Sequence, residues 1–459
     1  MNRLWTLVGV AVLALALSAC GEGEQEEGGA GTDETRAAGP VTIDFWHSET
    51  VANEATLERL IDRFNSSQND VKVRLTFQGG SNELILKLMT SLRSGDVPAL
   101  IELADVDTQV MIDSGEAAPV QEFMDAEEYD LSDFDEKAVQ YYSVGDELYA
   151  MPWGIAVPML FYNKVAFRDV GLDPGKPPAT IDDVRGYSEK LFKVDDAGNV
   201  VRSGPAIDIQ AWYLDLTLAE HGDLYVNNDN GRAGRATEAV FNGPTGQEFF
   251  RWWAEMVDTG LAFNVGRNPT GADTFLAVGA GRAAMTVGSS QALRSLLDVL
   301  ERGIEGVELG VGPFPGVVGG SGKPGIFSRA LWIMGSRPEA QQRAAWRVVS
   351  WLAEPEQQAE LFAGSGYLPV RLSAYDLDAS RQVLEKYPAY QVAVDLFVGT
   401  PSTSAKLGPR IGPFSKVRET VAQAIEEMVV GGKDPAQALD DAADRATREI
   451  QDYNRRLGE

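Results

Sequence analysis

Apolar residues in the first third of the chain switch between a spacing of two residues and a spacing of three or four. This switching predicts alternating strands and helices. Strands are expected at 41–46, 71–77 and 99–103, and helices at 57–64 and 83–93. A repeated strand–helix–strand order is typical of parallel strands joined by crossover helices, so the pattern predicts an α/β sheet.

The rest of the chain is expected to add further strands around a segment of mainly helical pattern, roughly 180–300. Aromatic residues crowd positions 247–256, which is typical of a helix buried in a core. Prolines at 338 and 355 mark the starts of two helices, because proline is favoured in the first helical turn. The further strands are expected at 149–152, 159–162, 283–287 and 330–334. The last helix carries an apolar stripe formed by Leu439, Ala443, Ala446, Ile450, Tyr453 and Leu457.

The first residues have the pattern of an export signal. Arg3 precedes an apolar run over 7–17, which is too short to span a membrane comfortably. Leu17-Ser18-Ala19-Cys20 follows and resembles the bacterial lipobox, in which the cysteine is lipidated and becomes the mature N-terminus. We therefore expect a signal peptide over 1–19 and a lipid anchor on Cys20. An ordinary signal peptide with an incidental cysteine is the alternative.

A tether is expected over 20–40. Its residues 21–39 include six glycines, six acidic side chains and no large apolar side chain. Such a segment cannot bury a core, and it repels itself. The composition predicts a flexible link of roughly 25 Å between an anchor and a folded body outside the cytoplasm.

Composition excludes several classes of protein. The chain has 459 residues, 44% of them hydrophobic, and a net charge of −28, which disfavours binding to nucleic acid. Only two histidines and one cysteine are present, so an HExxH zinc site, a zinc ribbon and an iron–sulfur cluster are excluded. We expect neither a metal nor a cofactor.

Three short patterns suggest enzymes but do not fit their motifs. Residues 319–323 (GGSGK) lack the first glycine of a phosphate-binding loop and end before a proline, so a surface turn is expected. No GxSxG nucleophile motif occurs, and Gly279-Ala280-Gly281 lacks the rest of a dinucleotide fingerprint. A pair of glycosidase carboxylates stays possible, because none of the acidic residues is singled out.

Several longer motifs occur in a characteristic order and point to one family. They are Phe45-Trp46-His47-Ser48, Ser94-Gly95-Asp96-Val97-Pro98-Ala99, Pro158-Met159-Leu160-Phe161-Tyr162-Asn163-Lys164, Gly171-Leu172-Asp173-Pro174, Pro177-Pro178-Ala179-Thr180 and Gly364-Ser365-Gly366-Tyr367-Leu368-Pro369. Together they resemble the family 1 extracellular solute-binding proteins of ABC importers, nearest to the receptors for glycerol 3-phosphate. The resemblance extends from about Val41 to Leu457.

The resemblance implies a fold and a function. The fold is α/β and two-lobed, like that of periplasmic binding proteins, with each lobe a sheet flanked by helices and the ligand in a cleft between them. Residues 41–153 are expected to form the first part of the N-terminal lobe, 154–300 mainly the second lobe, and 301–459 a crossover back with second-lobe and hinge-region helices. The implied protein is not an enzyme: it is a monomeric receptor that closes on a solute and delivers it to ABC permease subunits.

The resemblance also implies binding residues. Arg418, Tyr367 and Ser289 match the residues that hold the phosphate in the glycerol 3-phosphate receptors. Asp105 replaces a glutamate on the glycerol side, and Ser81 replaces a tyrosine. The remaining departures are Ala156 in place of a serine, and Ser328, followed by Arg329, in place of a glycine.

Two classes of ligand follow from these departures. The first is a glycerol phosphate or glycerophosphodiester, with Arg329 replacing the lost donors. The second is a neutral sugar or oligosaccharide, with Trp46, Trp153 or Trp212 stacking on the ring and Asp105 and Asp208 accepting from hydroxyls. His47 is a further candidate at the end of the first strand. Each of these residues also has a structural alternative, such as core packing, an ion pair or a helix cap.

Two other functions are considered beside transport. A tethered extracellular glycoside hydrolase would release product from a saccharide, and one carboxylate would be essential for that turnover. A surface adhesion or sensor protein would have no small ligand, so it would tolerate substitutions in the cleft.

Overall fold

The computed structural model describes residues 39–268, 271–301, 303 and 306–458. The signal peptide, Cys20 and nearly all of the tether therefore lie outside the described residues. Residues 40–459 form one compact unit. No helix in the part of the chain that the structure describes is both long enough and apolar enough to cross a membrane.

The first sheet has six strands, and its parallel part is the one that the sequence predicts. Strands β1, β2 and β3 are parallel, with helices α1 and α2 as their connections. Strand β14 then joins antiparallel to β3, and β4 and β7 pair antiparallel with β14. The sheet is therefore mixed, because strands from later in the chain extend it. The bounds are β1 (Val41–His47), α1 (Val51–Ser67), β2 (Val71–Phe77), α2 (Ser81–Ser94), β3 (Leu100–Ala104), β4 (Ala117–Ala118), β7 (Met151–Ala156) and β14 (Phe327–Met334).

The second sheet also has six strands and is mixed. Strand β10 is parallel to β11 and β12, whereas β8 is antiparallel to β12 and β13. A short strand, β9, pairs antiparallel with the start of β10. The bounds are β8 (Pro158–Asn163), β9 (Lys193–Val194), β10 (Val200–Ile207), β11 (Phe263–Asn264), β12 (Ala283–Ser289) and β13 (Leu309–Pro313). A separate hairpin joins β5 (Ser143–Val144) to β6 (Glu147–Leu148).

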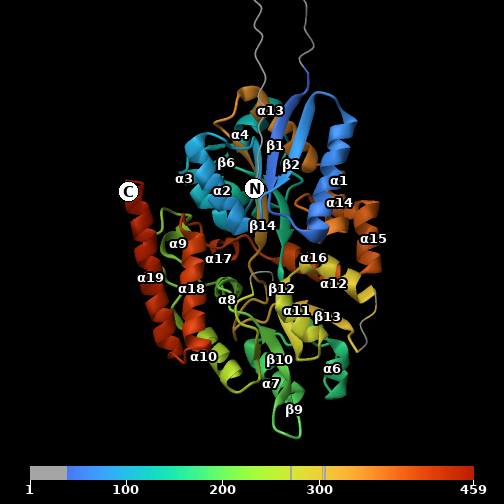
Figure 1. The fold of residues 1–459 in the computed structure, drawn as a ribbon, viewed down its shortest axis with the longest axis vertical. Helices are drawn as coiled ribbons and strands as arrows, with labels where there is room; N and C mark the ends of the chain where they lie inside the picture. The colour runs from blue at the N-terminus through green and yellow to red at the C-terminus, as the bar shows by residue number, and fades with distance from the viewer. Residues whose placement is uncertain (1–38, 269–270, 302, 304–305, 459) are drawn as a thin grey trace, which may run out of the picture. The chain divides into compact units, whose positions relative to one another are not determined.

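Each sheet has its own apolar core, so the unit has two lobes. Residues 327–397 return to the first core, and residues 411–450 pack in the second. Figure 1 shows β1, β2 and β14 in the upper half and β10, β12 and β13 in the lower half.

The helices extend both cores. Besides α1 and α2, those that contribute buried residues to the first core are α3 (Thr108–Asp113), α4 (Val120–Glu127), α5 (Glu136–Tyr142), α12 (Ala292–Glu301), α13 (Glu339–Leu352), α14 (Pro355–Ser365), α15 (Asp378–Lys386), α16 (Ala389–Gly399) and α17 (Ser404–Leu407). Those that contribute to the second are α6 (Lys164–Asp169), α7 (Ile181–Leu191), α8 (Trp212–His221), α10 (Pro244–Asp258), α18 (Phe414–Val429) and α19 (Pro435–Arg456). Helix α11 (Ala272–Gly279) packs on β12, and α9 (Asn227–Gly231) is a short turn near α17. The 3₁₀ turns are η1 (Asp105–Asp107) and η2 (Leu372–Asp376).

Helices α18 and α19 pack along each other at the left edge of Figure 1. The apolar stripe predicted for the last helix is confirmed from Leu439 to Ile450, which are buried in the second core. It is wrong for Leu457, which follows the end of the helix and is 42% exposed. The stripe ends early because the last turn extends beyond the second core.

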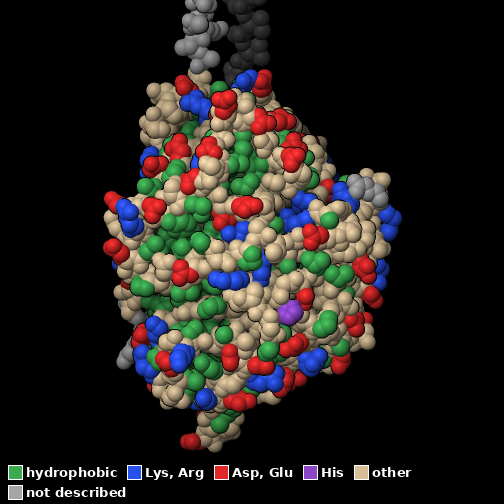
Figure 2. All heavy atoms as spheres, turned by 180° about the vertical axis from the view of Figure 1, so that it is seen from behind, with side chains coloured by type: hydrophobic (Ala, Val, Ile, Leu, Met, Phe, Trp, Pro, Cys, Tyr) green, Lys and Arg blue, Asp and Glu red, His purple; other side chains and the backbone are tan. Residues whose placement is uncertain are grey.

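Charge is distributed unevenly over the surface. On the face shown in Figure 2, acidic side chains are scattered from top to bottom, while several basic side chains gather near the middle. The net charge of −28 therefore does not produce a uniformly negative surface.

A pair of helical glycines tests the packing of the second lobe. Glycine in a helix is usually less stable than alanine by about 0.5–1 kcal/mol. A Cβ on Gly186 in α7 would meet nothing within 4 Å, so Gly186→Ala is expected to raise the free energy of unfolding by about that amount. A Cβ on Gly246 in α10 would lie 2.1 Å from the backbone oxygen of Phe241, so Gly246→Ala is expected to lower it by about 1–3 kcal/mol. Urea denaturation of both variants measures the two signs, and stabilisation by Gly246→Ala would contradict the packing described here.

Candidate functional site

The edge of the first sheet brings together polar residues from distant parts of the chain. The carboxyl ends of the parallel strands β1 and β3 meet the beginning of the antiparallel strand β14, where Arg329 pairs with Ala104. In sheets of this kind, residues that follow the carboxyl ends of parallel strands commonly form ligand sites. The segments just after β1 and β3 and the first residues of β14 therefore form one cluster.

Arg329 is at the centre of this cluster. Its Nη1 donates to Glu102 Oε1 at 2.6 Å and to Ser48 Oγ at 2.8 Å, and its Nη2 donates to Ser81 Oγ at 3.1 Å. Its Nε is 3.5 Å from Glu49 Oε1. Both glutamates are fully buried, so two carboxylates in a dry environment neutralise one guanidinium. The predicted candidates Ser81 and Arg329 are thus brought together.

Tyr367 connects this cluster to the second lobe. Its hydroxyl donates to Glu49 Oε1 at 2.8 Å and accepts from Gln291 Nε2 at 2.9 Å. Gln291 follows the second-lobe strand β12, and its backbone N–H donates to Ser289 Oγ at 3.2 Å. The ring of Tyr367 lies over Gly154, where a Cβ would come within 3.0 Å of it. Tyr367 and Ser289 therefore lie on one continuous polar chain between the lobes.

A second arginine faces the first lobe from helix α18. Arg418 is paired with Asp215, with Nε and Nη2 at 2.7 and 2.6 Å from Oδ2. The side chain of Asp105 accepts from the backbone N–H groups of Val106 and Ser328, at 2.8 and 3.2 Å. Burial raises the pKa of Asp105, and the charge of Arg418 opposes this shift. Asp105 and Arg418 thus attract each other across the lobes, while Asp215 already pairs with the arginine.

Carboxylates outnumber guanidinium groups in this region. Burial is the main cause that raises the pKa of Glu49, Asp105 and Asp215, and neighbouring carboxylates add to the rise for Glu49 and Asp215. Burial and the charge of Asp105 raise the pKa of Asp107 to about 7. The acidic side chains of the arginine–carboxylate cluster are Glu49, Glu102, Asp105, Asp107 and Asp215, and its basic side chains are Arg329 and Arg418. Among the described residues, no group of three or more His, Cys, Asp or Glu is arranged to hold a metal ion.

The aromatic candidates differ in how accessible they are. Trp153 is 1% exposed and packs against Tyr367 with ring centroids 6.1 Å apart. Trp46 is half-buried at the end of β1. Trp212 is also half-buried and stacks on its neighbour Tyr213 at 3.9 Å. Trp46 and Trp212 therefore retain exposed surface, whereas Trp153 belongs to the core.

The remaining candidates are buried or occupied by protein groups. His47 is 2% exposed beside Phe77, and burial lowers its pKa, so the imidazole is neutral in this environment. The hydroxyl of Ser328 is buried beside that of Tyr142. Asp208 accepts from the Tyr213 hydroxyl at 2.7 Å and from the Asn268 amide at 3.1 Å.

Sequence reasoning missed the residues that neutralise the arginines. Glu102 interrupts the otherwise apolar strand β3, and a charged residue within a buried strand is a signal that marks a paired site. Glu49 directly follows the Phe45-Trp46-His47-Ser48 motif already singled out. Asp215 and Gln291 had no comparable signal, because only the fold brings them beside their partners.

Comparison with known proteins identifies the family of this chain and its fold. The sequence pattern of the bacterial extracellular solute-binding proteins matches residues 59–392. The chain belongs to this family, whose two-lobed α/β fold it shares. It is a solute-binding protein of the kind that serves ABC importers.

Particular relatives extend this picture. The chain is 31% identical over 88% of its length to the sn-glycerol-3-phosphate-binding periplasmic protein UgpB of Pectobacterium atrosepticum, and the match covers 90% of that protein. In structure it is similar to UgpB of Mycobacterium tuberculosis in complex with glycerophosphocholine, with a TM-score of 0.74 at 20% identity, over 91% of this chain and all of that one. It is likewise similar to the sugar-binding protein MalE of Xanthomonas citri, with a TM-score of 0.73 at 19% identity, over 91% of this chain and 99% of that one.

The pKa of Asp107 gives a test of the buried acidic cluster. The folded protein holds a proton on Asp107 up to about pH 7, whereas the unfolded chain releases it near pH 4. Ionisation of Asp107 therefore costs the folded state stability as the pH rises through this window. Asparagine cannot ionise, so Asp107→Asn is expected to raise the Tm by an amount that grows from about pH 4 to about pH 7 and then stays constant.

Thermal unfolding across a pH series measures this difference. Asp146→Asn is the matched control, since Asp146 is exposed in the turn between β5 and β6. The difference in Tm between Asp146→Asn and the wild type should not vary over the same pH range. If the effect of Asp107→Asn on the Tm did not depend on pH, the raised pKa of Asp107 would be contradicted.

Proposed function

We propose that this protein captures an uncharged, hydroxyl-rich solute, a sugar or polyol derivative, between its two lobes and delivers it to membrane permease subunits. The observation that carries the proposal is the neutralisation of both arginines by buried carboxylates of the protein itself. Arg329 is already paired with Glu102, and Arg418 with Asp215. The proposal places the solute against Asp105, Ser328, Arg329 and Tyr367, with Trp46 or Trp212 beside it.

The chemistry of hydroxyl recognition supports this choice. Sugar hydroxyls both donate and accept, so a site for them needs carboxylates and arginines held in fixed positions. The cluster offers Asp105 as an acceptor and the hydroxyl of Ser328 as a group that can both donate and accept. A half-buried tryptophan supplies the apolar face that the C–H side of a sugar ring requires.

A phosphorylated ligand is the second candidate, and the relatives favour it. The protein from Pectobacterium atrosepticum is named for binding glycerol 3-phosphate, and the structure from Mycobacterium tuberculosis contains glycerophosphocholine. A phosphate monoester carries nearly two negative charges at pH 7 and would meet more carboxylates than arginines in this cluster. A glycerophosphodiester with a cationic head group has no net charge and fits the cluster better than a phosphate monoester.

The proposal includes export and attachment to the membrane. The apolar run, the lipobox-like Leu17-Ser18-Ala19-Cys20 segment and the glycine-rich acidic tether support a lipid-anchored receptor outside the cytoplasm. The receptor acts as a monomer and has no catalytic step. A tethered glycoside hydrolase has no supporting observation, since the buried carboxylates near the arginines are occupied by protein partners.

A ligand panel tests the class of solute. Thermal unfolding would be followed with mono- and disaccharides, glycerol, glycerophosphocholine, glycerol 3-phosphate and inorganic phosphate. A ligand at a hundred times its Kd stabilises by about 2.7 kcal/mol, which is a rise of roughly a few degrees in Tm. We expect a neutral saccharide or polyol derivative to give this rise and to reduce the radius of gyration in solution scattering. A rise with glycerol 3-phosphate that exceeds the rise with inorganic phosphate, without a rise from any neutral solute, would establish the second candidate, and release of product from a saccharide would establish the hydrolase.

The variant Asp105→Asn tests the proposed contact. It keeps the size of the side chain but removes the charge that orients hydroxyl donors, so the affinity for the solute found in the panel should fall by about tenfold or more. Asp146→Asn removes the same charge from an exposed turn and should leave the affinity unchanged. Titration calorimetry measures both, and equal affinities for Asp105→Asn and the wild type would remove Asp105 from the site.

A further inference from the structure

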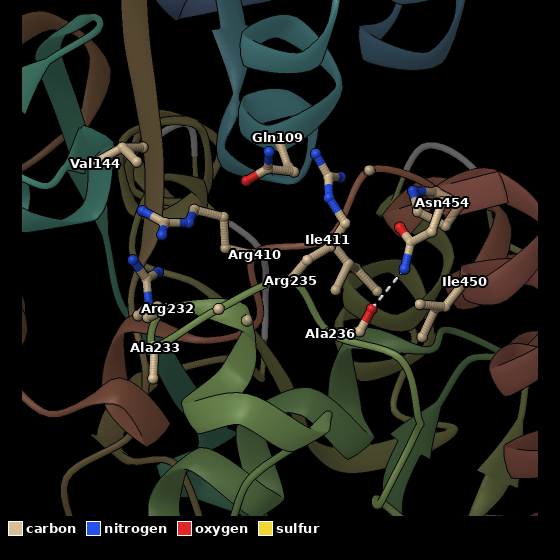
Figure 3. A pocket seen from close by; sticks show the side chains of 14 residues that line it. Gln109, Val144, Arg232, Ala233, Arg235, Ala236, Arg410, Ile411, Ile450 and Asn454 are labelled. Atoms are coloured by element: carbon tan, nitrogen blue, oxygen red, sulfur yellow. Dashed lines mark hydrogen bonds between the residues drawn. The ribbon is translucent and has the colours of Figure 1, made fainter. Parts of the chain in front are cut away.

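A pocket of about 360 Å³ lies apart from the arginine–carboxylate cluster. It is bounded by α3 and β5 of the first lobe and, from the second, by the segments 231–236 and 410–413 and helix α19. Figure 3 shows Gln109 above the pocket, Arg410 and Arg232 next to each other on one side, and Ile450 and Asn454 on the other. None of the residues that line it belongs to the cluster around Arg329 and Arg418.

Two arginines of this pocket lack the carboxylate partners that neutralise the others. Arg232 donates only to backbone carbonyls, those of Leu407, Gly408 and Tyr141, at 3.2, 3.3 and 3.5 Å. Arg410 donates from Nη1 to the carbonyl of Ser143 at 2.8 Å, and its Nε is buried without a partner.

Within the part of the chain that the structure describes, neither Arg232 nor Arg410 forms an ion pair. Their neighbour Arg235 differs, because Asp113 accepts from both of its Nη atoms, at 3.0 and 2.9 Å. Arg232 and Arg410 therefore place positive charge at the pocket without a directly paired carboxylate, and the charges of Asp229 and Asp113 act on them only from further away.

The two charges destabilise each other. The pKa of Arg232 is lowered to about 10, mainly by burial and partly by the charge of Arg410, while Tyr141 and Asp229 oppose the shift. The Tyr141 ring, 4.9 Å from the guanidinium, also forms a cation–π contact with it. Burial also lowers the pKa of Arg410. Two like charges held together in a protein of net charge −28 are an unfavourable arrangement, and an anion between them would relieve it.

The backbone holds the two arginines in place. Asn228, Asp229 and Asn230 all have positive φ, so α9 is a left-handed turn. Residues other than glycine rarely adopt this backbone conformation. The buried side chain of Asn230 maintains this turn through hydrogen bonds to the backbone of residues 225, 226 and 404. Its carbonyl accepts from the Arg410 N–H at 2.9 Å, and a Cβ on Gly231 would lie 2.3 Å from the Arg410 carbonyl oxygen. The segments that carry Arg232 and Arg410 are thus built against each other.

We propose that this pocket binds a small phosphate-type oxyanion, held by Arg232 and Arg410. The guanidinium group presents parallel N–H donors that match phosphate oxygens, and the unpartnered Arg410 Nε supplies one such donor. The amide of Gln109 in α3 adds a polar group from the first lobe. The volume is of the size that small ligands occupy in proteins. Because the pocket has walls from both lobes, a bound anion also links them. This site is separate from the proposed solute site, and the inference holds whichever solute is bound there.

Inorganic phosphate is the probe for this site. We expect saturable binding of one phosphate per chain by titration calorimetry and by ³¹P line broadening, weakening as salt is added. Arg410→Gln and Arg232→Gln should each lower the affinity by about tenfold or more. Arg251→Gln removes the same charge from an exposed position in α10 and should leave the affinity unchanged.

Further variants keep the test decisive. Arg418→Gln should not affect phosphate binding, and loss of binding in this variant would place the phosphate in the first cluster and overturn the proposal. If Arg410→Gln fails to fold, Arg410→Lys retains the charge but not the paired donors, and should show a smaller phosphate-induced rise in Tm than the wild type. Absence of saturable phosphate binding to the wild type, or equal binding by wild type and Arg410→Lys, would also overturn it.

Discussion

The pairing of Arg329 with Glu102 is the interaction on which the junction of the lobes depends. Glu102 is fully buried in β3, and it accepts from Arg329 on β14 and from the backbone and hydroxyl of Ser48 after β1. Breaking a buried pair of this kind typically costs about 3–5 kcal/mol, because the remaining charge has no partner. The pair thus fixes the edge of the first sheet, and through Glu49 and Tyr367 that edge reaches Gln291 in the second lobe.

The same interaction underlies our proposal for the solute. An arginine that is already neutralised positions donors for a ligand without attracting net negative charge to the site. Arg418 is restricted in the same way by Asp215. In contrast, the hydrogen bonds of Arg232 and Arg410 go to backbone carbonyls, and a carbonyl dipole does not neutralise a guanidinium as a paired carboxylate does. The protein therefore contains two kinds of arginine, one paired with buried carboxylates and one hydrogen-bonded to backbone carbonyls, and our two proposals rest on this difference.

The local spacing of apolar residues predicted much of the fold. The spacing of apolar residues predicted β1, β2 and β3 with their parallel order, because alternation and helical periodicity are properties of neighbouring residues. The antiparallel entry of β14 into the first sheet was not predicted, since nothing in residues 327–334 encodes a partner at 100–104. Leu457 was placed wrongly because periodicity continues past the point where a core ends.

The sequence by itself determined the alternation of strands and helices and the family. It also predicted candidate binding residues, among them Arg329, Tyr367, Asp105 and Arg418. The tertiary structure decided which charges meet. Glu102 and Arg329 are 227 positions apart, and Asp215 and Arg418 are 203 apart. Pairings over such distances are set by the packing of whole sheets and helices, and each adds too little free energy on its own to leave a pattern in the sequence. The proximity of Arg232 to Arg410 is a fact of the same kind, and only the folded chain reveals it.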